Sequence, residues 1–292
     1  MSFLDFYEYS MIGLLLGGLY ALIGLGFVLV YKATRVLNFA MGEFMMMGAY
    51  FYFTATVLMG MPWWAGVVIA LGASAVLALG VERLVLRPLV GQPTISIVMA
   101  TIGLAAILHG TAVMVWGADQ WRIEPIVPRA PFFLGDAMLP GQLVWGFGLA
   151  SMIIVGFVLY FRFARGGVAM RATASDPHTA MSLGIDAPRN TAVTWVLAAL
   201  ISTVAGIMVG AMNNVSPELG LVGLAVIVVV ILGGLDSIPG TIIAGLIIGW
   251  IESMSVAVFG SGVREIVPFA VILIIMMVRP FGLFGTPEIE RL

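Results

Sequence analysis

The sequence predicts an all-α protein, a polytopic membrane helix bundle of about eight to nine transmembrane or re-entrant helices. Hydrophobic residues make up 61% of the 292 residues and charged residues only 10%, whereas a soluble domain has roughly a quarter charged residues. The mean hydropathy is correspondingly high, at +1.12. In addition, apolar runs of spanning length recur along the chain, without the alternation over about ten residues that marks the strands of a membrane barrel.

Most of the apolar runs have the length that a bilayer core of about 30 Å requires of a helix, about 20 residues. They are, in order, residues 10–31, 36–58, 63–82, 93–116, 142–161, 190–212, 220–235, 240–259 and 263–279. The first run follows Asp5 and Glu8 without a preceding basic residue, which is the wrong charge for a secretory signal peptide, so we expect a retained span. The seventh run is short and bounded by glycines, which favours a re-entrant or broken helix.

The second and fourth runs carry ionisable groups at membrane depth, where a charged side chain costs at least about 2.5–3.5 kcal/mol. Glu43 lies in LNFAMGEFMMMGAY, and on a continuous helix Asn38, Gly42 and Met45 would form one stripe beside it. Either Glu43 faces a cavity or a break in the helix, or it makes an interhelical hydrogen bond. His109, in the fourth run, is expected to be a hydrogen-bonded packing residue rather than a proton relay.

Glycines four residues apart occur in three runs, as GLLLG in the first, GIMVG in the sixth and GLIIG in the eighth. Each pair lies on one helix face and allows a neighbouring backbone to approach closely. Such packing is common in membrane bundles and does not indicate a substrate. Glu252, shortly after the glycines of the eighth run, is interpreted as a structural group.

The distribution of basic residues predicts the orientation. With the N-terminus outside and nine crossings, Arg122, Arg129 and Arg264 fall outside and the other ten of the 13 basic residues fall inside. The inside residues are Lys32, Arg35, Arg83, Arg87, Arg162, Arg165, Arg171, Arg189, Arg279 and Arg291. The positive-inside rule favours this arrangement, with a cytoplasmic C-terminus. The outside loop 117–141 is then placed to act as a lid or to receive an external partner.

One polar segment, RATASDPHTAMSLGIDAPR at residues 171–189, interrupts the apolar runs on the predicted cytoplasmic side. Asp176 or Ser175 suits an N-cap, Pro177 the first helical position and Gly184 the left-handed position after a helix. The segment therefore predicts a short capped helix with exposed apolar residues. Such a helix either docks into another protein or lies on the lipid headgroups.

Several functions are excluded because the chain lacks the residues they need. Lys32 is the only lysine and no GxxxxGK[ST] loop is present, so the chain is not itself a P-loop ATPase. Two histidines exclude HExxH metal chemistry and give little support to an intramembrane protease. The absence of cysteine removes thiolate and disulfide chemistry. A net charge of −2 argues against nucleic acid as a partner. These absences argue against an enzyme and against a metal or a cofactor of the chain's own.

Five motifs in matching order resemble the LivH-type permease of branched-chain amino-acid ABC transporters over nearly the whole chain. They are VLNFAMGEFMMMGAY, ATIGLAAILHG, RATASDPHTAMSLGI, NNVSPELG and VILGGLDSIPGTIIAGLIIGWIE. Family members often carry His or Gln at the position of Met41 and Lys near Ala225. Related permeases serve urea, short amides and small carboxylates, so the resemblance implies a small polar solute and leaves open which one.

The resemblance also implies partners and a location. It implies a bacterial inner-membrane subunit that pairs with a LivM-type homologous permease, two cytoplasmic ATP-binding subunits and a periplasmic solute-binding protein. ATP and Mg²⁺ would be bound by the ATPase subunits. Residues 1–292 would form one permease domain, with residues 162–189 as its cytoplasmic coupling loop and helix.

Two groups of residues carry these expectations. Polar or small residues within or at the mouths of the spans are expected to lie on or beside the substrate pathway: Asn38, Gly42, Glu43, Thr101, Asn213 and Asn214. The ATPase-coupling group consists of Arg171, Asp176, Pro177, Met181, Leu183 and Gly184. In this group Met181 and Leu183 would insert into the ATPase, while the cap and the glycine hold the helix rigid. A self-sufficient ion-coupled secondary transporter or channel is the alternative, since broken helices and an intramembrane carboxylate also suit that class.

Overall fold

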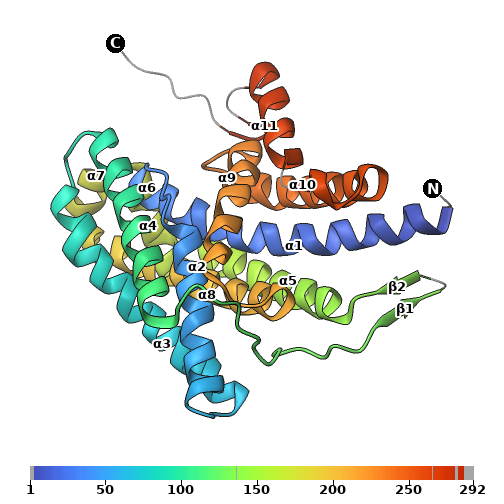
Figure 1. Ribbon diagram of the computed structural model, residues 1–292. Helices are drawn as coiled ribbons and strands as arrows, with labels where there is room; N and C mark the ends of the chain where they lie inside the picture. Colours follow the sequence, from blue (N-terminus) through green and yellow to red (C-terminus); the bar gives the residue numbers. More distant parts are fainter. Residues whose placement is uncertain (1–2, 136, 265, 280–281, 286–292) are drawn as a thin grey trace. The chain divides into compact units, whose positions relative to one another are not determined.

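The computed structural model describes residues 3–135, 137–264, 266–279 and 282–285, and their secondary structure is almost entirely helical (Figure 1). The N-terminal helices are α1 (Phe3–Thr34), α2 (Met41–Phe53), α3 (Trp63–Val81) and α4 (Thr94–Trp116). The strands β1 (Phe132–Leu134) and β2 (Ala137–Leu139) follow. The remaining helices are α5 (Gly141–Phe163), α6 (Arg165–Ser175), α7 (Pro177–Ser182), α8 (Ala187–Asn213), α9 (Val222–Gly233), α10 (Ile238–Phe259) and α11 (Ile266–Val278).

Six of the nine expected spans are confirmed in order and in approximate bounds, whereas the second and ninth runs form the shorter helices α2 and α11, of 13 residues each. Among the described residues, six helices are long and apolar enough to cross a membrane, namely α1, α3, α4, α5, α8 and α10. The expected short seventh run is α9, which begins after a 3₁₀ segment at Pro217–Leu221. The chain is therefore a multi-pass membrane protein. Arg291, which we expected on the cytoplasmic side, lies outside the described residues.

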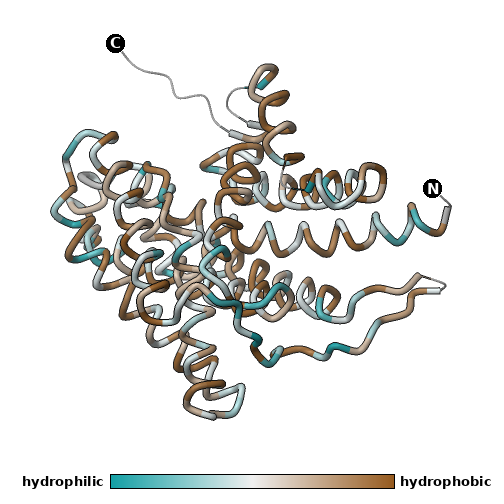
Figure 2. The backbone as a smooth tube through the Cα atoms, viewed as in Figure 1, coloured by the Kyte–Doolittle hydropathy of each residue, from teal (hydrophilic) through white to brown (hydrophobic). Residues whose placement is uncertain are grey.

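Polar residues are confined to a few places on the bundle. Figure 2 shows apolar residues along most of the length of the helices, with hydrophilic residues in the segment 117–131 and near the start of α1. Large apolar side chains are exposed on α3 and α4, for example Val76 and Met114. Exposed apolar residues on a helix of spanning length face lipid or another subunit rather than water.

The chain forms two compact units, the first made of residues 1–28, 127–151 and 225–292. In this unit, α1 crosses α10 through the two predicted glycine pairs. A Cβ at Gly17 would lie 2.6 Å from the Gly245 carbonyl oxygen, and one at Gly13 would lie 2.8 Å from that of Gly249. The backbones touch at this crossing, so the close-packing interpretation of GLLLG and GLIIG is confirmed.

Glu252 joins three segments of the same unit. Its Oε2 accepts a hydrogen bond from the Tyr20 hydroxyl at 2.8 Å, and its Oε1 accepts one from Arg264 Nε at 2.6 Å. The Glu252 side chain is buried, and a buried carboxylate is stable only when it is paired in this way. The structural interpretation of Glu252 is thus confirmed.

The second unit consists of residues 29–126 and 152–224, with α2 at its centre. Helix α2 packs against α3, α4 and α8, and all of its residues except Phe51 are buried. Gly48 lies against Thr203, and Gly206 lies against the Met45 carbonyl oxygen, so α2 and α8 meet along their backbones.

A short hairpin, β1–β2, lies in the expected outside loop and was not predicted. Its strands are antiparallel, with Phe132 opposite Leu139 and Phe133 opposite Met138. Phe132, Phe133 and Met138 are exposed. Six residues of strand produce too weak a periodicity to be recognised in the sequence.

Candidate functional site

The loop that precedes α2 fixes the start of the central helix. The Asn38 side chain accepts a hydrogen bond from the Ala40 N–H at 3.0 Å, and Thr101 Oγ1 on α4 accepts one from the Phe39 N–H at 3.4 Å. The expected stripe through Asn38 on one continuous helix is therefore wrong, because the chain turns at residues 39–40 and α2 begins at Met41. Asn38 instead holds the turn that starts α2, and Thr101 attaches this turn to α4.

Gly42 and Glu43, in the first turn of α2, lie against the 3₁₀ segment that leads to α9. A Cβ at Gly42 would collide with the Gly220 carbonyl oxygen and would lie 3.0 Å from Gly223 Cα. A Cβ at Gly220 would lie 2.5 Å from Glu43 Oε1. The segment thus contacts both the α2 backbone and the carboxylate, and glycine at positions 42 and 220 makes this approach possible.

The Glu43 carboxylate is buried and only partly satisfied. Its side chain is 11% exposed, and Oε2 lies 3.7 Å from His109 Nδ1 on α4. Within the described part of the chain, Oε2 has no hydrogen-bond partner. A buried carboxylate oxygen without a partner carries a large desolvation cost. The arrangement is suited to accept a hydrogen bond from a cationic or polar solute, or from His109 after a small movement.

Three further buried polar groups on α2 and α8 were missed by the sequence analysis: Tyr50, Trp195 and Ser202. The Tyr50 hydroxyl, Trp195 Nε1 and the Ser202 hydroxyl have no hydrogen-bond partner among the described residues. Trp195 also packs against Phe44, with ring centroids 6.2 Å apart. Tyr50 and Trp195 could have been identified from the sequence, because each places a hydroxyl or an indole N–H in the middle of an apolar run.

Asn213 and Asn214 lie at the C-terminal end of α8. Asn214 has a positive φ of 67°, and the next residue, Val215, forms an antiparallel bridge with Trp121 through two 2.8 Å hydrogen bonds. No hydrogen bond or ion pair of the described residues joins either asparagine to Glu43 or Thr101. The structure therefore brings Asn38, Gly42, Glu43 and Thr101 together but shows no link from them to this pair.

The polar segment after α5 folds into two helices, of which only α7 was predicted. Asp176 Oδ1 accepts a hydrogen bond from the Thr179 N–H at 3.1 Å, as an N-cap does. At the other end, Gly184 has a φ of 82°. The Ile185 N–H donates to the Ala180 carbonyl and the Gly184 N–H donates to that of Met181, both at 3.0 Å. This is the Schellman arrangement, so the predicted cap and stop are both confirmed.

The apolar residues predicted to dock are exposed. Met181 is 45% exposed and Leu183 is 75% exposed, whereas Ala180 is buried. Pro177 begins α7. Arg171, on α6, donates hydrogen bonds to the carbonyl oxygens of Phe161 and Arg162 at the end of α5. The contacts of Arg171 are therefore internal and stabilise the turn from α5 into α6.

A multi-pass helical protein with a short, buried helix, α2, and a short capped helix that exposes apolar side chains, α7, has the features of a transporter permease. The family described as "Branched-chain amino acid transport system / permease component" matches residues 10–276. The chain belongs to this family. As a permease component of an ABC transport system, it is not an enzyme and relies on partner ATPases, which decides against the self-sufficient transporter or channel.

Several relatives resemble the chain over nearly their whole length. The high-affinity branched-chain amino acid transport system permease protein LivH of Escherichia coli K12 is 30% identical over 310 residues, covering 99% of both chains. The corresponding protein BraD of Pseudomonas aeruginosa is 31% identical and covers 96% of this chain and 95% of BraD. A probable LivH of Methanocaldococcus jannaschii is 28% identical, with 91% and 89% covered.

Among solved structures, the chain resembles one from "PsaBC from Streptococcus pneumoniae in complex with Fab". The two chains are 13% identical, with a TM-score of 0.49, and the match covers 94% of this chain and 92% of the other.

Proposed function

We propose that this chain is the membrane pathway for a branched-chain amino acid or a related small polar solute, imported at the expense of ATP hydrolysed by partner subunits. The named function of LivH and BraD supports the solute class. The observation that carries the proposal is the Glu43 carboxylate, buried in the first turn of α2 with Oε2 unsatisfied among the described groups. A solute carrying an ammonium group would complete that oxygen's hydrogen bonding during passage.

The pathway in this proposal follows α2. Asn38 and Thr101 hold its first turn, Gly42 permits the contact with the segment before α9, and Glu43 faces the solute. Asn213 and Asn214 lie at the outside mouth, next to the bridge that Val215 makes with Trp121. Both ends of that bridge lie in segments predicted to be outside.

We assign four partner components to the functional complex: a LivM-type homologous permease, two cytoplasmic ATPase subunits that bind ATP and Mg²⁺, and a periplasmic solute-binding protein. In this assignment residues 1–292 act as one permease domain of the bacterial inner membrane, and residues 162–189 form its coupling loop. The exposed Met181 and Leu183 dock into the ATPase, while the Asp176 cap and the Gly184 stop give α7 a fixed length.

The proposed orientation places the N-terminus outside and the C-terminus in the cytoplasm. In support, Arg83, Arg87 and Arg189 line one pocket, and all three are predicted to be inside. Cysteine substitutions at Met181 and at Phe133 test the orientation in intact cells with a membrane-impermeant maleimide, since the natural chain has no cysteine. We expect the reagent to label the cysteine at residue 133 and not the one at residue 181. Labelling at residue 181 only would show that the orientation is the opposite one.

The experiment that tests the function is uptake into proteoliposomes containing the complete complex, with the binding protein outside and ATP in the lumen. Leucine uptake is expected to require ATP and to be lost with Glu43→Ala. Retention of full uptake by Glu43→Ala would remove Glu43 from the pathway. If the natural chain imports urea or an amide instead of leucine, the proposed solute is wrong, whereas the proposed pathway still stands.

A further inference from the structure

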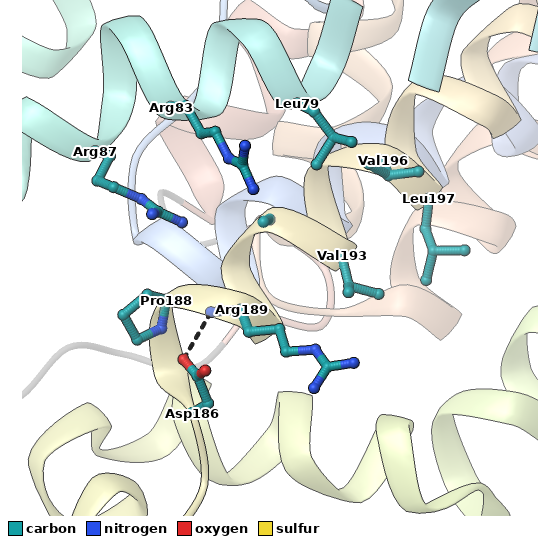
Figure 3. A pocket seen from close by; sticks show the side chains of 10 residues that line it. Leu79, Arg83, Arg87, Asp186, Pro188, Arg189, Val193, Val196 and Leu197 are labelled. Carbon is teal, nitrogen blue, oxygen red and sulfur yellow. Dashed lines mark hydrogen bonds between the residues drawn. The ribbon is translucent and has the colours of Figure 1, made fainter. Parts of the chain in front are cut away.

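An open pocket of about 560 Å³ lies between α3 and α8 in the second unit (Figure 3). This volume is within the range of roughly 300–1,000 Å³ that small-molecule sites occupy. It is lined by Leu79, Arg83 and Arg87 on the α3 side and by residues of the N-terminal part of α8 on the other side. Helix α3 continues as the π-helical turn Glu82–Leu86, which carries Arg83, and the 3₁₀ turn Arg87–Leu89. The three lining residues of this side are spaced by four and lie on one face.

The polar and apolar residues of this pocket are separated along both helices. Toward the end of the α3 span, the lining changes from Leu79 to Arg83 and then to Arg87. Helix α8 begins with Arg189 and continues into the span with Val193 and then Val196 and Leu197. Both helices thus place arginine at their ends and aliphatic side chains deeper in the span.

Two of the three arginines are available to a ligand. Arg87 Nε forms an ion pair with Glu82 at 3.2 Å. For Arg83 and Arg189, no described carboxylate lies within ion-pair distance. Asp186, the acidic lining residue, accepts a hydrogen bond from the Arg189 N–H at 3.0 Å and thereby caps α8, as the dashed line in Figure 3 shows. Two exposed guanidinium groups therefore remain beside an aliphatic wall.

The surroundings of the pocket favour lipid over a protein segment. Leu84, next to Arg83 in the π-helical turn that continues α3, is 80% exposed, and Val76 on α3 is also exposed. Apolar side chains in these positions on a spanning helix contact acyl chains. Basic pockets between transmembrane helices at the cytoplasmic face are suited to anionic lipid headgroups, because guanidinium groups bind phosphate in a planar, bidentate manner.

We propose that this pocket binds one anionic phospholipid, with its headgroup at the end lined by Arg83 and Arg189 and the first part of its acyl chain along Val193, Val196 and Leu197. On the proposed orientation the lipid belongs to the cytoplasmic leaflet. The bound lipid joins the end of α3 to the start of α8, close to the coupling segment. The site is separate from the pathway residues of α2 and requires no particular transported solute.

The test uses the complete permease complex in mild detergent and measures lipid adducts by native mass spectrometry. Phosphatidylglycerol, phosphatidylcholine and inorganic phosphate are titrated separately. Phosphatidylglycerol is expected to bind in preference to phosphatidylcholine. The double variant Arg83→Gln/Arg189→Gln is expected to weaken its binding roughly 30-fold, which corresponds to about 1 kcal/mol for each of the two charges.

Two variants serve as controls. Arg83→Lys/Arg189→Lys keeps both charges and is expected to stay within a few-fold of the natural chain, which shows that the glutamine variant fails for lack of charge. Arg279→Gln removes an exposed arginine that does not line the pocket and is expected to leave lipid binding unchanged.

Three results would overturn the proposal. Equal binding of both lipids, or unchanged phosphatidylglycerol binding by the glutamine variant, would show that the pocket does not select an anionic lipid. Displacement of phosphatidylglycerol by inorganic phosphate at equal concentration would identify a site for a free anion. Loss of the ATPase subunits from the glutamine variant, with lipid binding retained, would identify a protein contact.

Discussion

At the scale of single residues, Glu43 combines burial, an unsatisfied Oε2 and contact with a glycine backbone. The 3.7 Å distance to His109 Nδ1 exceeds that of a good hydrogen bond, so the carboxylate retains capacity for another partner. Helix α2 begins two residues earlier and is buried on nearly every side, which holds the carboxylate in place. The same features predict how substitutions at Glu43 and at its glycine neighbours behave.

Glu43→Gln keeps the shape of the side chain and removes its charge. If the carboxylate binds a cationic group of the solute, transport should fall by roughly 10- to 100-fold, since a hydrogen bond to a charged group contributes about 1.5–3 kcal/mol. Assembly with the partner subunits should be retained. Uptake in proteoliposomes measures this, with Glu218→Gln as control because Glu218 is exposed on the adjoining segment. Unchanged uptake by Glu43→Gln would show that the charge is not used.

Gly220→Ala introduces a Cβ against the Glu43 carboxylate. Overpacking of this kind typically costs about 1–3 kcal/mol, so we expect a lower melting temperature and impaired transport. Gly103→Ala is the control, since a Cβ at that helical position meets nothing within 4 Å. Thermal unfolding of both variants in detergent checks the prediction, which would be wrong if the two melted alike.

At the scale of elements, the sequence predicted the long helices well because about 20 apolar residues in lipid have few alternatives to a helix. The cap and stop of α7 were also predicted, since Asp176 and Gly184 act through local backbone geometry. Helix α6 was not predicted, because its residues are weakly hydrophobic and its stability depends on contacts such as those of Arg171 with the end of α5. The break before α2 depends on Thr101, which is distant in sequence.

Helix α7 gives a prediction about coupling. Met181→Ala removes an exposed apolar side chain, and Gly184→Val places a β-branched residue at a φ of 82°, which it adopts only with strain. Both variants should hydrolyse ATP without proportional transport or lose ATPase subunits, while the bundle stays folded. Met138→Ala, also exposed but in the hairpin, should couple normally. If both α7 variants couple ATP hydrolysis to uptake normally, this segment is only a linker.

The α1–α10 crossing gives a second prediction at this scale. Gly17→Val would push apart two backbones that lie in contact, and we expect loss of the folded permease from membranes. Gly148→Val is the matched control, because a Cβ at Gly148 meets nothing within 4 Å. Fluorescence-detected size exclusion of tagged chains compares the two. Equal yields of monodisperse protein would show that the crossing tolerates the added volume.

At the scale of the whole molecule, the chain belongs to a permease family and its sequence contains no phosphate-binding loop, so the energy of ATP reaches it from partner subunits. Composition and topology predicted the class of protein because they reflect the solvent, and the ordered motifs predicted the family. The pathway was less predictable from the sequence. Buried groups such as Tyr50 and Trp195, and the pocket between Arg83 and Arg189, depend on which helices become neighbours in the folded bundle.

The most direct test of the central claim is leucine uptake by proteoliposomes that contain this chain with its second permease and ATPase subunits, with the binding protein added outside. Uptake should require ATP in the lumen, should persist after ionophores dissipate the proton and sodium gradients, and should be absent when the ATPase subunits are omitted. Uptake by the chain without ATPase subunits, driven by an imposed ion gradient, would contradict the account.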